Sequence, residues 1–286
     1  MVPLDLRQLF LEHPVLRETD LGELRNEIDD IDPQQFSRWL SSKELIKKLL
    51  DLKVLKKTRF DFEGNYRSEV RYLYGEPAEA KVALSLAPKG YVSHYTAMAM
   101  HGLTAQVPKN IYVSVEQSAK PKSNQRLTQQ AVDTAFAKPQ RKTKLITTFN
   151  GQRITIVNSA YSGNLGITTD DDGINISNLE RTLIDCVVRP NYAGGVQQVA
   201  QAFAEAADRV SVREITTILR ALNYTYPYHQ AIGFYLQRSG AYSKSDVNLF
   251  RKQLMDIDFY LAHNLPNKVY VPEWKLFVPQ GMHDLQ

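Results

Sequence analysis

The segment at residues 177–186, SNLERTLIDC, constrains the fold most, because it combines a helix start with an amphipathic repeat. Ser177 and Glu180 have the spacing of a capping box, in which each side chain satisfies a backbone amide of the first helical turn. The apolar residues that follow recur at helical period: Leu179, Leu183, Ile184 and Val187. Arg189-Pro190 ends this helix, and Gly194-Gly195 allows a turn before the next one. The segment predicts a packed helix, and nothing in it resembles an active site.

Length and composition favour a two-domain globular protein. The chain has 286 residues, which exceeds the usual size of one domain, and 43% of them are hydrophobic and 23% charged. The single cysteine, Cys186, excludes an intramolecular disulfide framework, and we expect a buried thiol. No apolar run approaches the length of about 20 residues that spans a bilayer, and the sequence does not start like a secretory signal. We therefore expect a cytoplasmic protein without a membrane partner.

Charge is divided within the first 75 residues. Acidic residues dominate residues 1–35, and basic residues dominate residues 36–75. The second stretch has the polarity that a surface facing nucleic acid needs. The sequence therefore directs attention to residues 36–75 as a candidate interface.

Helix and turn signals in this region come in the order of a winged helix-turn-helix. A short helix around Leu6 is followed by a helix that begins at Asp32-Pro33, and then by one from Ser41 or Ser42 to about Leu52. Residues 54–62 and 66–74 are rich in β-branched and aromatic residues and are joined by turn residues at 63–65, so they predict a hairpin. We predict a winged helix-turn-helix DNA-binding domain over residues 1–75.

In such a domain a helix enters the major groove and the wing lies along the backbone, so both need long cationic side chains. The predicted DNA-binding residues of the helical part are Arg38, Lys43, Lys47 and Lys48. Those of the wing are Arg59, Asn65 and Arg67. The alternative is that the lysines form a solvated helix face. We expect Phe36 and Trp39 to lie in the core rather than to stack on bases.

Residues 76–286 predict a mixed α/β domain with a helical C-terminal half, so the whole chain is expected to be α+β. Asn150-Gly151 is a strong hairpin signal, and a second hairpin is expected to turn at residues 171–173. Helices are expected at these later ranges: 177–188, 195–207, 211–222, 227–238 and 245–263.

Several segments of this second domain together resemble the AbiEi family. They are GYVSHYTAMAMHGL at 90–103, IYVSV at 111–115, SNLERTLID at 177–185, Arg189-Pro190, AGGV at 193–196, and IGFYL at 232–236 with Gly240. This family comprises antitoxins of AbiE-type abortive-infection toxin–antitoxin systems. The resemblance implies a transcriptional autoregulator that binds operator DNA through its N-terminal winged helix. It also implies a C-terminal domain that opposes a nucleotidyltransferase-like toxin without a stable complex.

Patterns that could carry catalysis are weak. Ser239-Gly240 with Asp256 and Asp258 is faintly similar to nucleotidyltransferase elements, but the Gly-Ser order is reversed and helical periodicity continues through the segment. Asp170-Asp171-Asp172 fits a hairpin turn better than a cation site, and His94 and His101 have no third ligand nearby. We therefore expect no enzymatic activity, metal or cofactor. The alternatives are a metal-dependent nuclease or nucleotidyltransferase that uses these aspartates, or a non-catalytic interaction scaffold.

A second basic stretch lies at residues 109–144. Its candidate contact residues are Lys120, Lys122, Arg126, Arg141, Lys142 and Lys144. It could be a solvated, linker-like excursion, or a positive surface that meets an acidic toxin, DNA or RNA.

Overall fold

The computed structural model describes residues 3–65, 67–119 and 126–283, and the chain is α+β as predicted. It forms two compact units. The first is Met1–Pro88 with Lys144–Ile154, and the second is Lys89–Thr143 with Thr155–Gln286. The predicted boundary at residues 75 and 76 precedes the end of the first unit, which also takes in a later hairpin.

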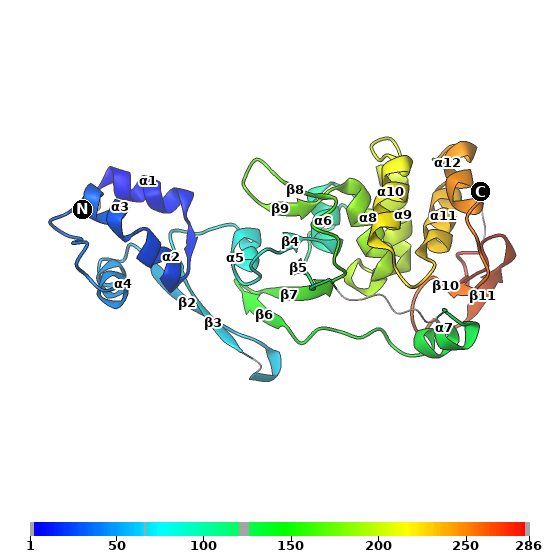
Figure 1. The fold of residues 1–286 in the computed structure, drawn as a ribbon, viewed down its shortest axis with the longest axis horizontal. Helices are drawn as coiled ribbons and strands as arrows, with labels where there is room; N and C mark the ends of the chain where they lie inside the picture. Colours follow the sequence, from blue (N-terminus) through cyan, green and yellow to red (C-terminus); the bar gives the residue numbers. More distant parts are fainter. Residues whose placement is uncertain (1–2, 66, 120–125, 284–286) are drawn as a thin grey trace. The chain divides into compact units, whose positions relative to one another are not determined.

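Helices and a small antiparallel sheet make up the first unit (Figure 1). Its elements in chain order are α1 (Leu4–Glu12), β1 (Val15–Leu16), α2 (Glu18–Glu23), α3 (Arg25–Ile31), α4 (Ser42–Asp51), β2 (Lys56–Asp61), the 3-10 turn η1 (Glu63–Asn65), β3 (Ser68–Leu73) and α5 (Glu79–Ser85). The sheet order is β1-β3-β2, and the β2–β3 register runs from Lys56 opposite Leu73 to Asp61 opposite Ser68. The predicted hairpin is therefore confirmed.

A capping box starts α4 at the predicted place. The Ser41 hydroxyl accepts a hydrogen bond from the Glu44 amide, and the Glu44 carboxylate accepts one from the Ser41 amide at 2.8 Å. Leu45 and Leu49 of α4 then point inward and are almost fully buried, as are Leu6 and Phe10 of α1. Helical period thus places one face of α4 in the core and leaves the other to solvent.

The predicted helix at Asp32-Pro33 is wrong. Residues 32–40 form turns, and helices α2 and α3 instead occupy residues 18–31. The Asp32 carboxylate accepts a hydrogen bond from the Gln35 amide at 3.1 Å, and the Asp29 carboxylate accepts one from the Arg38 amide at 3.0 Å. These side chains thus bind backbone amides that would otherwise form helical hydrogen bonds. Phe36 is 1% exposed, but Trp39 is 89% exposed, which corrects its expected burial.

A mixed sheet with helices beside it forms most of the second unit (Figure 1). Its elements in chain order are β4 (Tyr91–Val92), α6 (His94–Met100), β5 (Asn110–Glu116), α7 (Gln129–Phe136), β7 (Gln152–Ser159), β8 (Ile167–Thr169), β9 (Asn175–Ser177), α8 (Leu179–Val188), η2 (Pro190–Tyr192), α9 (Val196–Ala206), α10 (Val212–Leu222), α11 (Tyr228–Ser239), α12 (Lys244–Arg251), β10 (Phe259–Tyr260), β11 (Lys268–Val271), η3 (Pro272–Trp274) and β12 (Leu276–Pro279). In the strand order β7-β5-β4-β9-β8, β4 pairs in parallel with β9 and antiparallel with β5.

Both hairpins predicted for residues 76–286 are present. Strand β6 (Ile146–Phe149) turns into β7 at Asn150 and Gly151, whose φ angles are 48° and 79°, as a two-residue hairpin turn requires. The β8–β9 hairpin closes at Asp170, which accepts the amides of Asp172 at 3.0 Å and Ile174 at 2.8 Å. Asp170 is thus part of a turn, as expected.

Helix α8 begins one residue later than the sequence indicates. Its cap is Asn178, whose side chain accepts the Arg181 amide at 2.8 Å, whereas Ser177 ends β9 and is fully buried. Glu180 accepts the backbone amide of Ser211 at 2.9 Å, at the start of α10. The prediction of a capping box at Ser177 and Glu180 is therefore wrong, because Ser177 is the last residue of strand β9 and the helix begins after it.

The C-terminal part also departs from prediction. Helix α12 ends at Arg251 rather than near residue 263, and a three-stranded sheet of order β10-β12-β11 follows. The buried amide of Gln230 donates to the carbonyls of Ile257, Trp274 and Lys275 at 2.8–3.0 Å. These non-local hydrogen bonds hold the chain extended where the local pattern favours helix.

No helix of the described chain is both long and apolar enough to cross a membrane. The Cys186 thiol is fully buried, as predicted, and burial raises its pKa.

Candidate nucleic-acid interface

Two of the predicted DNA-binding lysines lie free on one face of α4. Lys43 and Lys47 are one helical turn apart, and both side chains are exposed. Among the described residues neither has an ion-pair or hydrogen-bond partner. Both ammonium groups are therefore available to an anionic partner.

Lys48 and Arg38 instead hold the turn that precedes α4. Lys48 donates through Nζ to the Gln35 carbonyl and lies 5.5 Å from the centre of the Phe36 ring. Arg38 pairs with Asp29 at 2.7 Å and with Asp30 at 3.2 Å. Their charges are already engaged, so we expect them to position α4 rather than to contact DNA.

The predicted wing residues are also mostly engaged. Arg59 pairs with Asp61 at 2.8 Å. Arg67 donates to the Leu86 carbonyl at 3.0 Å and lies 4.5 Å from the centre of the Phe62 ring. The side chain of Asn65 lies outside the described residues.

Lys56 and Lys57 are exposed at the start of β2, and the prediction did not include them among its contact residues. Lys57 pairs with Tyr72 of β3 in the sheet register, and Tyr72 packs into the hydrophobic core that the helices form. The run of basic residues at the start of the hairpin could have identified both lysines from the sequence. Together with Lys43 and Lys47, they give the first unit a set of free ammonium groups.

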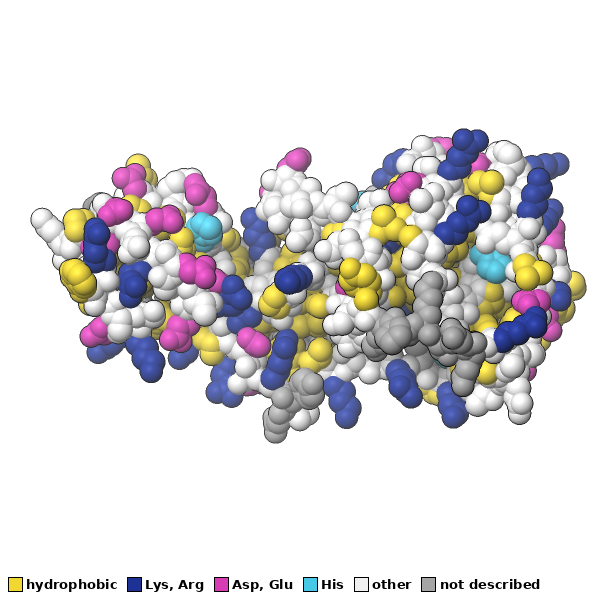
Figure 2. Space-filling model, viewed as in Figure 1, with side chains coloured by type: hydrophobic (Ala, Val, Ile, Leu, Met, Phe, Trp, Pro, Cys, Tyr) yellow, Lys and Arg dark blue, Asp and Glu magenta, His cyan; other side chains and the backbone are white. Residues whose placement is uncertain are grey.

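Trp39 is an exposed aromatic side chain in the turn that precedes α4. It lies two residues before Ser41, the cap of α4, and is 89% exposed. On the face that Figure 2 displays, acidic and basic side chains are interspersed over the first unit, and basic ones protrude along its lower edge. The charge division of the sequence therefore does not give this face a single sign.

The second basic stretch is only partly described. Lys120 and Lys122 lie outside the described residues, and Arg126 pairs with Asp256 at 3.5 Å. Arg141, Lys142 and Lys144 are exposed, and Lys144 belongs to the first unit. The linker-like alternative concerned the chain around Pro121 and Pro139. Pro121 lies outside the described residues, and Pro139 lies in a loop after helix α7.

The aspartates and histidines considered for catalysis have structural partners. Asp256 pairs with Arg126, and Asp258 accepts the Tyr270 hydroxyl at 2.6 Å, in a segment that is not helical. His94 Nδ1 lies 2.8 Å from the Ser93 hydroxyl, and His101 Nε2 lies 2.7 Å from the Ser177 carbonyl. No group of three or more potential metal ligands occurs within the described ranges.

The fold thus defines an α+β protein of two units. The first joins short helices to a hairpin with free lysines, and the larger second one is built on a mixed sheet. No family model matches the chain, and no curated protein matches it. Among solved structures, the crystal structure of the RV2827C protein from Mycobacterium tuberculosis is similar, with a TM-score of 0.55. The sequences are 13% identical, and the match covers 92% of this chain and 86% of that one. At this identity the likeness concerns the fold alone.

Proposed function

We propose that this protein is a DNA-binding transcriptional autoregulator and antitoxin of an abortive-infection toxin–antitoxin system, of the AbiEi kind. In this proposal the first unit is a winged helix-turn-helix that binds operator DNA. The second unit opposes a nucleotidyltransferase-like toxin without forming a stable complex with it.

The pair of free lysines on α4 carries the DNA-binding half. Lys43 and Lys47 are exposed on one helix face, directly after a capped start, and the β2–β3 hairpin follows. A helix that presents such a face can lie in the major groove while the hairpin follows the phosphates. Each lysine that neutralises a phosphate also releases counterions, which favours binding.

The order of elements supports the winged-helix interpretation. Helices α1 to α4 precede the hairpin, and β1 adds a third strand to it. The engaged side chains of Arg38 and Lys48 tie residues 29–36 to the region around α4, so they would hold the helix at a fixed angle. Preorganisation of this kind lowers the entropic cost of binding.

The antitoxin half depends on the family resemblance of the second unit. Its segments at 90–103 and 177–196 form buried structure around β4, α6 and α8 rather than a surface. The resemblance therefore supports a shared fold for the antitoxin unit.

Gel-shift titration of the full chain on the DNA upstream of its own gene tests the first half. We expect binding that a scrambled duplex does not reproduce, and at least a tenfold loss in the double variant Lys43→Glu/Lys47→Glu. The matched control is Lys244→Glu/Lys252→Glu, which makes the same charge change on exposed lysines at α12. Equal binding by both double variants would overturn the proposal.

Co-expression tests the second half. The full chain should restore growth to cells that express the neighbouring toxin gene, and the Lys43→Glu/Lys47→Glu variant should do so as well, because the two activities lie in different units. Failure of the wild-type chain to rescue growth would contradict the antitoxin assignment.

A further inference from the structure

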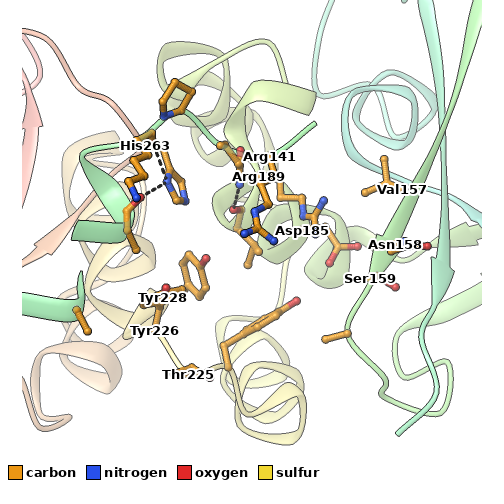
Figure 3. A pocket seen from close by; sticks show the side chains of 18 of the residues that line it. Arg141, Val157, Asn158, Ser159, Asp185, Arg189, Thr225, Tyr226, Tyr228 and His263 are labelled. Atoms are coloured by element: carbon orange, nitrogen blue, oxygen red, sulfur yellow. Dashed lines mark hydrogen bonds between the residues drawn. The ribbon is translucent and has the colours of Figure 1, made fainter. Parts of the chain in front are cut away.

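The second unit contains a cavity of about 990 Å³ that the proposed function does not use. This volume lies at the upper end of the range of about 300–1,000 Å³ that is usual for small-ligand sites. Its walls come from α7 and the segment after it, from the end of β7, from the end of α8 and from residues 224–228 (Figure 3). All the lining residues belong to the one unit.

Positive charge dominates this cavity. Its cationic side chains are Lys138, Arg141 and Arg189, and Asp185 is the one carboxylate among the described lining residues. Asp185 is already neutralised, because Arg181 donates to it at 2.9 Å. An anion would therefore meet unbalanced cations.

Among these cations, Arg189 gives the strongest argument for a bound anion. It is partly buried at the end of α8, and within the described part of the chain its guanidinium has no carboxylate or hydrogen-bond partner. Its guanidinium lies 6.0 Å from the centre of the Tyr192 ring, and its charge acts to lower the pKa of the buried Asp185 carboxyl. A partly buried guanidinium that makes no hydrogen bond has lost part of its hydration, so a bound anion that accepts from it is favoured.

The histidines of the cavity do not add to this charge at neutral pH. Burial lowers the pKa of His94 to about 3 and also lowers the pKa of His263. Both rings are therefore neutral near pH 7, and the arginines and Lys138 supply the positive charge.

Aromatic side chains form the wall that faces the cations. Tyr226 lies in the segment that joins α10 to α11, and Tyr228 is the first residue of α11. The Tyr226 ring is held edge-on against Phe136, with the ring centres 5.1 Å apart. In Figure 3, Arg141 and Arg189 enter the space between these tyrosines on one side and Asn158 and Ser159 of β7 on the other. The tyrosines can stack on a planar ring, and the amide and hydroxyl can bond to its edge.

We propose that this cavity binds a nucleoside di- or triphosphate, with the phosphates at Arg189 and Arg141 and the base against the tyrosines. Phosphate oxygens match the fork of a guanidinium, and a base matches an aromatic wall with amide donors beside it. A ligand with only one of these groups would leave half of the lining unused. This site is independent of DNA binding by the first unit.

Isothermal titration of the full chain with ATP, GTP, CTP and UTP tests the proposal, with adenosine and inorganic triphosphate as the two half-ligands. We expect at least one nucleotide to bind at least tenfold more tightly than either half. The variants Arg189→Gln and Arg141→Gln should each weaken that binding at least tenfold. The control Arg213→Gln removes an exposed arginine of α10 outside the cavity and should leave it unchanged.

Thermal unfolding checks that each variant is folded. If Arg189→Gln does not fold, Arg141→Gln still tests the proposal, because the Arg141 side chain is exposed. Several results would overturn the proposal. They are the absence of binding by all four nucleotides at millimolar concentration, equal binding of triphosphate and nucleotide, and binding that neither arginine variant changes. Binding of a single-stranded oligonucleotide in preference to every nucleotide, with the same dependence on Arg189, would also overturn it, because the ligand would then be a polymer.

Discussion

Arg181 is fully buried at the centre of the second unit, which is unusual for an arginine. Its guanidinium donates to Asp185 at 2.9 Å, to the Tyr91 hydroxyl at 2.9 Å and to the Leu165 carbonyl at 2.8 Å. Burial acts to lower the pKa of Arg181, but the interactions with Asp185, Tyr91 and Tyr224 together outweigh burial, and the pKa is raised. The hydrogen bonds link α8 to β4 and to the loop before β8, so Arg181 joins three separate parts of the chain.

Arg181→Met should therefore destabilise the protein strongly. It leaves the buried Asp185 carboxylate unpaired, which costs about 3–5 kcal/mol. Urea unfolding measures the change, with Arg213→Gln as the exposed control, for which we expect less than about 0.5 kcal/mol. Equal unfolding midpoints for the two variants would refute this role.

His94 makes stability depend on pH. Its folded pKa is lowered to about 3, while the unfolded value is about 6.5. Below about pH 6.5 the His94 ring binds a proton in the unfolded chain but not in the folded chain. The free energy of unfolding therefore falls as the pH falls from about 6.5 to about 3. Between pH 7 and pH 5 this residue alone should cost about 2 kcal/mol.

Urea unfolding of the wild type and of His94→Asn at both pH values isolates this effect. Asparagine is the suitable replacement because His94 has a φ of 51°, a left-handed conformation that asparagine tolerates. The variant should lose about 2 kcal/mol less than the wild type between the two pH values. Equal losses would show that His94 is not the group responsible.

The two tryptophans have opposite environments, which fluorescence can separate. Trp39 is 89% exposed and Trp274 is fully buried. In Trp39→Phe we expect the remaining emission to be blue-shifted and poorly quenched by acrylamide, because Trp274 alone emits. Emission from that variant that is still strongly quenched would contradict the burial of Trp274.

At the scale of elements, α11 packs closely against η3, the turn between strands β11 and β12 of the C-terminal sheet. Gly233 of α11 lies against the ring of Trp274, and a Cβ at Gly233 would overlap the ring atoms Cζ3 and Cη2. The absence of a side chain at this helix position is what admits the indole. The Gln237 side chain then accepts the indole N–H at 2.8 Å.

Gly233→Ala should accordingly destabilise the protein. Alanine inside a helix normally stabilises a protein by about 1 kcal/mol relative to glycine. Overpacking a core costs about 1–3 kcal/mol, and we expect this cost to be the larger effect here. Thermal unfolding gives the sign directly. Adding Trp274→Phe to Gly233→Ala should recover part of the loss, and a stabilising Gly233→Ala would contradict the packing.

The sequence predicted the elements that local chemistry determines. The Ser41 cap, the Asn150-Gly151 turn and the β2–β3 hairpin depend on neighbouring residues, and all three are present. The failures occurred where distant partners decide the outcome. Ser177 is taken by strand β9, and the chain after Arg251 is held extended by Gln230 from α11.

The candidate site shows the same limit. Periodicity identified Lys43 and Lys47 as exposed, because α4 is amphipathic. It could not show that Arg38 and Arg67 are occupied by Asp29 and by the Leu86 carbonyl, since those partners are 9 and 19 residues away. Trp39 was misplaced because a turn replaced the helix that would have buried it.

At the scale of the whole molecule, the proposals assign different ligands to the two units. The first unit presents free lysines on α4, and the second contains an open cavity lined by Lys138, Arg141 and Arg189. Each proposal therefore has variants that should leave the other activity intact. Arg189→Gln should not change DNA binding, and the Lys43/Lys47 variants should not change nucleotide binding.

The salt dependence of DNA binding tests the central claim most directly. Fluorescence anisotropy of the full chain on its upstream DNA, repeated over a range of salt concentrations, gives the slope of log Kd against log salt. Each phosphate contact contributes about 0.9 to that slope, so Lys43→Gln/Lys47→Gln should reduce its magnitude by about 2. A slope that stays the same in this variant, or binding that is insensitive to salt, would contradict the assignment of α4 as the helix that contacts DNA.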